Sequence, residues 1–193
     1  NMTTSRADFY HNTVVMFGSG SSRALNVTNG TTARMNFRNN IFVCYNNGYP
    51  AYFSTRNYFG TTLNLSYNNY YGNTYVGYIA GAMNNLNAWT NSSREQRAAN
   101  VDPMFQDYTV SGKCRAYTGM YCPMLADVPF DILDSTRNLQ TAMGCYSADS
   151  LGVDAALSEF VGWPAYLASS GATPVKVKFM NAGGSALTAA DIN

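Results

Sequence analysis

The sequence predicts an all-β protein whose first part is a solenoid of short, stacked coils. The first observation is compositional: aromatic residues make up 14% of the chain, and charged residues only 12%, about half the globular average. The second is a pattern of three similar segments that recurs along the first third of the chain. The third is a set of short runs in which apolar and polar residues alternate, as in half-buried strands.

The repeat is centred on an Asn that stands just before an apolar run. Aligning the three segments places Asn12, Asn40 and Asn69 at equivalent positions, 28 and 29 residues apart. A repeat of this length with short strands and polar turns fits one coil of a β-solenoid, and the Leu framework of a leucine-rich repeat is missing. Identical Asn side chains stacked between coils can form a hydrogen-bonded ladder. We expect these three residues to form one, the alternative being a chance alignment in a chain rich in Asn.

Each coil is expected to contain two or three strands. Alternating runs precede the second and third aligned Asn, and strand-like runs lie in the middle of the first two repeats. The predicted strands cover residues 23–27, 33–37, 50–54 and 62–66.

Charge and hydropathy exclude several classes of function. The net charge is +1 without a basic patch, so we expect no nucleic-acid partner. No apolar run approaches the roughly 20 residues of a membrane span, so we expect no membrane insertion. Because the chain shows neither an initiator Met nor a signal peptide, we expect it to be a fragment of a longer protein.

The four cysteines do not have the spacing of a metal site. No Cys-x-x-Cys pair occurs and His11 is the single histidine, so we expect no metal and no cofactor. Cys114 and Cys122 bracket a short loop with a Gly that could close as a hairpin, which favours a disulfide between them in a secreted protein. The alternative is a pair of buried thiols. Cys44, within an apolar run, is expected in the core.

Residues from about 8 to 147 resemble the C-terminal coils of bacterial right-handed parallel β-helix proteins, the pectate-lyase-like superfamily. They resemble in particular large secreted proteins of Bacteroidetes-type bacteria. The matching motifs are Asn39-Asn40-Ile41-Phe42, Asn68-Asn69-Tyr70-Tyr71, Ala88-Trp89, Asp102-Pro103-Met104-Phe105, Asp131 to Arg137, and Met143-Gly144-Cys145-Tyr146. Asp134 and Cys145 stand where the family usually has Gly and Ala.

This resemblance implies a right-handed parallel β-helix over residues 1–147. Its last coil is expected to be closed by a structural ion pair between Asp131 and Arg137. Residues 148–193 resemble a linker and the first strands of an immunoglobulin-like module, which would form a partial β-sandwich. In this part Val175, Val177 and Phe179 alternate as in a strand with one apolar face.

Candidate catalytic residues are not found. Family members that cleave acidic polysaccharides use Arg or Lys as a base, together with carboxylates that hold Ca²⁺, but no Asp or Glu occurs from Asn12 to Asn91. No Gly-x-Ser-x-Gly motif accompanies His11, whose expected role is structural. Whether the chain is part of an enzyme stays open, but the lack of candidate catalytic residues argues against an enzyme.

Tyrosines are dense between residues 45 and 78, which suggests a glycan-binding face. Tyr58, Tyr70 and Tyr71 are the candidate binding residues. The alternative is that the tyrosines form a neutral solvated face and pack between coils.

The sequence therefore predicts a structural or adhesive module of a large secreted or cell-surface bacterial protein, exported by a type IX kind of secretion route. The expected partners are surface glycans or the secretion and anchoring machinery. Two alternatives remain: the non-catalytic C-terminal part of a polysaccharide-degrading enzyme, and a glycan-binding module.

Overall fold

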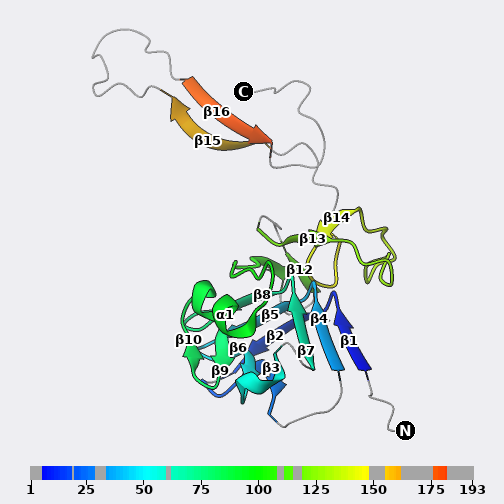
Figure 1. Cartoon of the computed structure of the whole chain (residues 1–193). Coiled ribbons are helices and arrows are strands. Elements are labelled where there is room, and N and C mark those ends of the chain that lie inside the picture. The colour runs from blue at the N-terminus through cyan, green and yellow to red at the C-terminus, as the bar shows by residue number, and fades with distance from the viewer. Residues whose placement is uncertain are drawn as a thin grey trace, which may run out of the picture. The chain divides into compact units, whose positions relative to one another are not determined.

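The computed structural model describes residues 6–18, 20–28, 34–59, 62–107, 111–114, 119–147, 155–161 and 176–181. The chain divides into two compact units, residues 1–148 and residues 149–193. Most of the described residues that have regular structure lie in β-strands, which agrees with the all-β prediction (Figure 1).

The first unit is built on three sheets whose parallel strands follow one another in the same chain order. The strands are β1 (Arg6–Tyr10), β2 (Thr13–Phe17), β3 (Arg23–Val27), β4 (Arg34–Arg38), β5 (Ile41–Tyr45), β6 (Tyr49–Phe53), β7 (Leu63–Ser66), β8 (Asn69–Gly72) and β9 (Gly77–Ile79). One sheet contains β1, β4 and β7, the second β2, β5 and β8, and the third β3, β6 and β9 (Figure 1). Each round of the chain, meaning three consecutive strands, thus adds one strand to every sheet. The four predicted strands are present, each within one residue of its predicted ends.

The register between rounds is constant. In the first two sheets, residues that pair across neighbouring strands are 28 apart in sequence, as Phe9 with Phe37 and Ile41 with Asn69. In the third sheet they are 26 apart, as Tyr52 with Tyr78. Because side chains alternate between the two faces of a strand, this register decides which residues enter the core and which face solvent.

A left-handed residue turns the chain from the first sheet to the second in every round. It is His11 (φ 54°), Asn39 (φ 60°) and Tyr67 (φ 55°) in the three rounds, and Arg97 (φ 60°) beyond them. The backbone N–H of each of the first three donates to a carbonyl of the next round, at 3.0 to 3.2 Å. Asn is enriched in this conformation, but Tyr67 and Arg97 adopt it at the same corner although their residue types do not favour it. The corner is therefore set by the stacked backbone rather than by residue preference.

The core of the three rounds is closed at its C-terminal side by α1 (Leu86–Ser93), which follows β10 (Ala82–Met83). The side chain of Asn85 caps α1 by accepting a hydrogen bond from the backbone N–H of Ala88 at 2.8 Å. Trp89 of α1 is completely buried, with its ring centroid 4.5 Å from that of Tyr70 and 6.0 Å from that of Phe53. The helix therefore covers aromatic core side chains of the second and third rounds.

A closing segment follows, with β11 (Phe105–Asp107), β12 (Ser111–Cys114), β13 (Tyr121–Pro123) and β14 (Gln140–Ala142). Arg137 is buried here, and its guanidinium group donates to backbone carbonyls of Phe130, Ala142, Gly144, Cys145 and Tyr146. The carboxylate of Asp131 instead accepts from the backbone N–H groups of Leu133, Ser135 and Ser147.

The predicted ion pair between Asp131 and Arg137 stays a prediction. The hydrogen bonds described for both side chains organise the closing segment mainly through backbone groups, and Asp131 also accepts from the hydroxyl of Ser147. The physical reason is that an irregular buried segment leaves many peptide groups without strand partners, and a guanidinium or a carboxylate satisfies several at once.

The predicted disulfide is corrected. Cys114 and Cys122 are both buried and are present as thiols, not as a disulfide. The thiol of Cys122 donates to the carbonyl of Thr141 at 3.6 Å, and burial raises its pKa to about 12. Cys122 lies in β13, which pairs with β14, whereas Cys114 lies in β12, which pairs with β11, so the two residues belong to different hairpins.

The second unit contains β15 (Ala155–Val161) and β16 (Lys176–Asn181), which pair antiparallel. The strand predicted from Val175, Val177 and Phe179 corresponds to β16. The rest of the predicted immunoglobulin-like module lies outside the described residues.

Candidate functional site

A column of amide side chains follows the corner between the first two sheets. Asn12 donates to Oδ1 of Asn40 from its backbone N–H at 2.9 Å and from its Nδ2 at 3.0 Å. Asn40 donates in the same two ways to Oδ1 of Asn68, at 3.0 and 2.8 Å. Asn40 and Asn68 are completely buried. The ladder thus keeps the 28-residue register, and its third member is Asn68.

The assignment of Asn69 to the ladder is wrong by one residue. Asn69 lies in β8, where its Nδ2 donates to the carbonyl of Val101 at 2.8 Å and its Oδ1 accepts the backbone N–H of Val101 at 2.9 Å. The Asn-Asn pairs of the second and third rounds look equivalent in sequence. In the structure, however, the left-handed corner position is occupied by Asn39 in one round and by Tyr67 in the next. Aligning the two pairs therefore shifts the third round by one position.

Glu95 ends the ladder. Its Oε1 accepts from the backbone N–H of Asn68 at 3.1 Å and from Nδ2 of Asn68 at 2.7 Å, and its Oε2 accepts from Nε1 of Trp89 at 3.0 Å. A carboxylate offers only acceptors, so it can close a chain of donors. Burial raises the pKa of Glu95 to about 7, although these donors favour the charged form. The hydroxyl of Tyr70 is buried nearby, and burial together with Glu95 raises the pKa of Tyr70 well above its usual value.

His11 is a neutral structural residue. Its Nδ1 lies 3.3 Å from the carbonyl oxygen of Gly144 and its Nε2 lies 3.0 Å from Nδ2 of Asn39. These partners suit a tautomer with the proton on Nδ1. Burial, and then the charge of Arg137, lower the pKa of His11 to about 4. The imidazole is therefore uncharged near neutral pH, and its two nitrogens are occupied by Asn39 of the second round and by Gly144 of the closing segment.

The three tyrosines predicted to bind a glycan do not form a common site. Tyr70 is completely buried in the core, so this candidate is wrong. Tyr71 is partly buried and packs edge-on against the ring of Tyr45, with centroids 6.2 Å apart. Tyr58 ends the short helix η1 (Arg56–Tyr58), and its side chain lies outside the described part of the structure.

Four other tyrosines stack on the outer face of the third sheet. The rings of Tyr52 and Tyr78 are 4.4 Å apart and nearly parallel, and those of Tyr49 and Tyr75 are 4.8 Å apart. The guanidinium group of Arg23 lies 3.5 Å from the centre of the Tyr52 ring. Because β6 has β9 on one side and β3 on the other, the two faces of Tyr52 are covered by Tyr78 and by Arg23. The stacked faces are not available to a sugar ring, so these residues stabilise the sheet.

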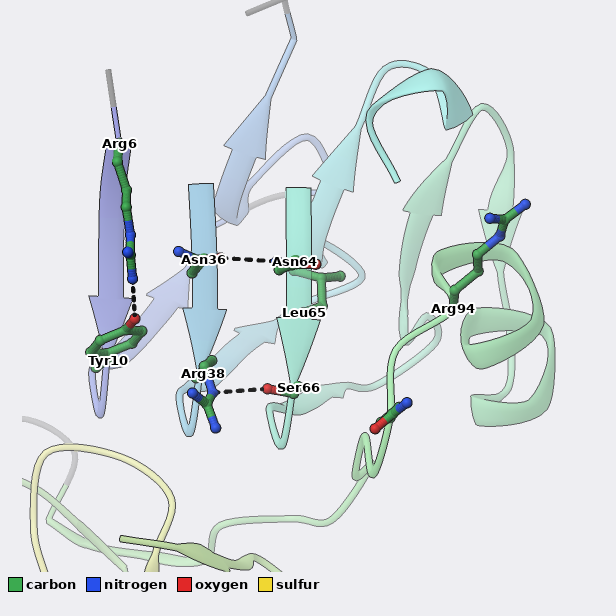
Figure 2. Close-up of a pocket in the computed structure, with 9 residues that line it drawn as sticks. Arg6, Tyr10, Asn36, Arg38, Asn64, Leu65, Ser66 and Arg94 are labelled. Carbon is green, nitrogen blue, oxygen red and sulfur yellow. Dashed lines mark hydrogen bonds between the residues drawn. The ribbon is translucent and has the colours of Figure 1, made fainter. Parts of the chain in front are cut away.

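A polar groove of about 370 Å³ lies on the outer face of the sheet that contains β1, β4 and β7 (Figure 2). Its nine lining residues are Arg6, Tyr10, Asn36, Arg38, Asn64, Leu65, Ser66, Arg94 and Gln96. We call this feature the arginine groove.

Hydrogen bonds between neighbouring strands fix the floor of the arginine groove. Asn64 donates from Nδ2 to Oδ1 of Asn36 at 3.2 Å, and Arg38 donates from Nε to Oγ of Ser66 at 3.2 Å (Figure 2). Asn36 donates in turn to the carboxylate of Asp8. These contacts hold the side chains in a fixed arrangement before any ligand binds.

The arginine groove is positively charged. Arg6, Arg38 and Arg94 line it, and none of its nine lining residues carries a carboxylate. Arg6 is partly neutralised by Asp8, whose Oδ1 lies 2.9 Å from Nε of Arg6. The side chain of Arg94, at the C-terminal end of α1, has neither a hydrogen bond nor an ion pair with any described residue.

The sequence did not reveal this groove because its cations are far apart in the chain. Arg6 and Arg38 come from successive rounds, and Arg94 follows α1 beyond the third round, so only the folded chain brings the three arginines to one groove. A usable signal was present: Tyr10 and Arg38 occupy equivalent outer positions one round apart, as do Asp8 and Asn36. Reading the repeat for its polar face as well as its apolar face would have indicated the site.

Comparisons with family models, with curated proteins and with solved structures find no match to this chain. No helix among the described residues is long and apolar enough to cross a membrane.

Proposed function

We propose that this chain is a rigid right-handed β-helix module that binds anionic glycans through the arginine groove, as an adhesive part of a larger secreted or cell-surface bacterial protein. The β-helix is supported by three sheets with parallel strands in constant register. The secreted location and the immunoglobulin-like nature of the second unit follow from the sequence resemblance and are parts of the same proposal.

The observation that carries the proposal is the composition of the arginine groove. A guanidinium group binds a carboxylate or a sulfate through two parallel hydrogen bonds, which makes Arg the preferred partner of such anions. Between the arginines lie the side-chain amides of Asn36 and Asn64, which can donate to and accept from sugar hydroxyls. Charged groups spaced by neutral hydrogen-bonding groups match the chemistry of an acidic oligosaccharide.

A binding role fits this groove better than a catalytic one. Its lining contains no carboxylate, histidine or cysteine that could act as a general acid, a general base or a nucleophile. His11 and Glu95, whose pKa values are shifted by burial, are buried and hydrogen-bonded within the fold. His11 lies at the left-handed corner and Glu95 ends the ladder, so both residues have a structural role.

The test is a calorimetric comparison of two hexasaccharides, one a hexamer of a uronic acid and the other the neutral hexamer of the corresponding hexose. We expect the acidic hexamer to bind more tightly. Arg38→Gln should weaken its binding by about tenfold or more, because it removes a charge-assisted contact.

Arg34→Gln is the matched control, because Arg34 is exposed on the same strand, β4, and does not line the groove. Its affinity for the acidic hexamer should stay within about twofold of the wild-type value, less than 0.5 kcal/mol. Equal affinity for the two hexamers, or equal losses in the two variants, would refute the proposed ligand class.

A further inference from the structure

A second hollow adjoins the arginine groove at Arg94. It has a volume of about 390 Å³ and lies between η1 and the C-terminal end of α1. Its lining residues are Arg56, Phe59, Asn91, Ser92 and Arg94. Arg94 is the residue that lines both hollows.

The positive charge of this hollow is not neutralised by its surroundings. Arg56 and Arg94 are exposed, and neither side chain has a hydrogen bond or an ion pair with any described residue. None of the five lining residues is acidic. The nearest acid in sequence, Glu95, is buried, and both of its oxygens are bound within the fold. The carbonyl end of α1 offsets only part of this charge.

The backbone of Arg94 is unusual for a residue with a long side chain. Arg94 ends α1 in the left-handed conformation, with φ 58° and ψ 21°, and its N–H donates to the carbonyl of Thr90 at 2.9 Å. Gly is strongly preferred at this position of a helix, because other residues are strained there. Here that position holds a guanidinium group that lines both cationic hollows.

The polar groups around the two arginines are suited to an oxyanion. Two guanidinium groups can each present two donors to the oxygens of one group. Asn91 donates to Asn87 at 3.4 Å and keeps a second amide N–H, and Ser92 donates to the sulfur of Met83 at 3.8 Å, a weak contact that an oxyanion can replace. Phe59 is buried and gives the hollow one apolar wall. None of these residues carries a negatively charged group that would bind a cation.

We propose that the hollow between η1 and α1 is a second anion site, which takes a sulfate or carboxylate substituent of the glycan that occupies the arginine groove. The link to that glycan rests on the proposed function. The binding of an oxyanion by Arg56 and Arg94 does not. The ligand class is thereby narrowed to acidic glycans that carry anionic groups on a branch or on more than one sugar residue.

Inorganic sulfate is the probe for this site, and the Nε–Hε signals of the arginine side chains in NMR spectra are the readout. We expect sulfate to shift the signals of Arg56 and Arg94 along saturable curves with the same dissociation constant. Arg56→Gln should weaken that binding at least tenfold at Arg94. Arg34→Gln, on the outside of the first sheet, should leave it unchanged.

Arg94→Gly separates binding from stability. If Arg94 were only a helix cap, Gly would serve at least as well, so the melting temperature should be unchanged or raised. The saturable shift at Arg56 should nevertheless be lost. Shifts at Arg56 that do not saturate, or that persist in Arg94→Gly, would overturn the second site. Saturable sulfate binding with no affinity for the acidic hexamer would refute the proposed function and keep this site.

Discussion

At the scale of single residues, the amide ladder shows how a buried polar column is made compatible with an apolar core. Each Asn accepts from the round before it and donates to the round after it, and each buried Nδ2 also donates to a backbone carbonyl, as Asn40 does to Phe9 at 2.8 Å. Hydrogen bonds aligned in this way polarise one another. The ladder therefore couples the rounds in one register, and removing a middle member should break it on both sides.

Asn40→Ala should destabilise the protein by about 2 to 4 kcal/mol, because it leaves the buried acceptor of Asn68 and the donors of Asn12 without their partner and removes a fully buried side chain. Asn36→Ala is the control, since Asn36 forms a similar chain between rounds on the solvent side of β4. That variant should lose less than about 1 kcal/mol. Urea denaturation of both variants measures the difference, and similar losses would contradict the role of the buried ladder.

The buried end of the ladder makes stability depend on pH. The pKa of Glu95 is raised from 4.5 to about 7, so the folded state holds this proton more tightly than the unfolded state does. The stabilisation is complete below pH 4.5 and is lost as the pH rises to about 7. Over this range the difference in unfolding free energy between wild type and Glu95→Gln should change by about 3 kcal/mol.

Urea unfolding at several pH values between 4 and 8 measures this change. Comparison with Glu95→Gln is needed because other carboxylates titrate in the opposite sense; for example, hydrogen bonds from Ser147 and from backbone N–H groups lower the pKa of Asp131 despite its partial burial. A constant difference between the two proteins across this range would show that Glu95 does not titrate there.

At the scale of elements, helix α1 depends on a glycine of the sheet that it covers. A Cβ added to Gly77 of β9 would collide with the ring of Trp89 and come within 2.9 Å of the carbonyl oxygen of Ala51. The helix can seat its Trp only because this position carries no side chain. Neither Gly77 nor Trp89 could be assigned this role from the sequence. Their contact joins β9 to α1, and the placement of α1 on the sheet depends on the chain between them, which includes β10.

Gly77→Ala should therefore cost about 1 to 3 kcal/mol through overpacking. A Cβ on Gly81, at the turn between β9 and β10, would have no neighbour within 4 Å. Gly81→Ala is thus the matched control, and its stability should be unchanged or slightly raised. Thermal denaturation followed by the fluorescence of Trp89 and its neighbours compares them, and equal losses would contradict the packing of α1 on β9.

The sequence also predicted elements with unequal success for physical reasons. Strands β4 and β7 were found because alternation reports burial locally, and β3 and β6 were found because strand-like runs recur in the middle of the repeats. The closing segment was predicted less well, since Arg137 and Asp131 bind peptide groups that only the folded loop presents. The environment of Cys122 was missed for the same reason. The sequence did not show that the strand of Cys122, β13, pairs with β14 and not with the strand of Cys114, β12.

At the scale of the whole molecule, one number connects the fold to the proposed site. The 28-residue register places Tyr10, Arg38 and Ser66 in one outer column, as it places Asn12, Asn40 and Asn68 in the ladder. A shift of one residue would exchange the inner and outer faces of a strand. The arginine groove and the buried ladder are therefore consequences of the same pairing. The sequence repeat predicted the stacking, but it could not choose between Asn68 and Asn69, which are both fully buried.

The central claim, that the rounds pair in this register, is tested most directly by nuclear Overhauser effects among the side-chain amides of the Asn residues. The Hδ2 protons of Asn40 should show contacts to Asn12 and to Asn68, while those of Asn69 should show contacts to the backbone of Val101. Contacts from Asn40 to the amide of Asn69, without contacts to Asn68, would contradict the register. They would also remove the basis for the arginine groove.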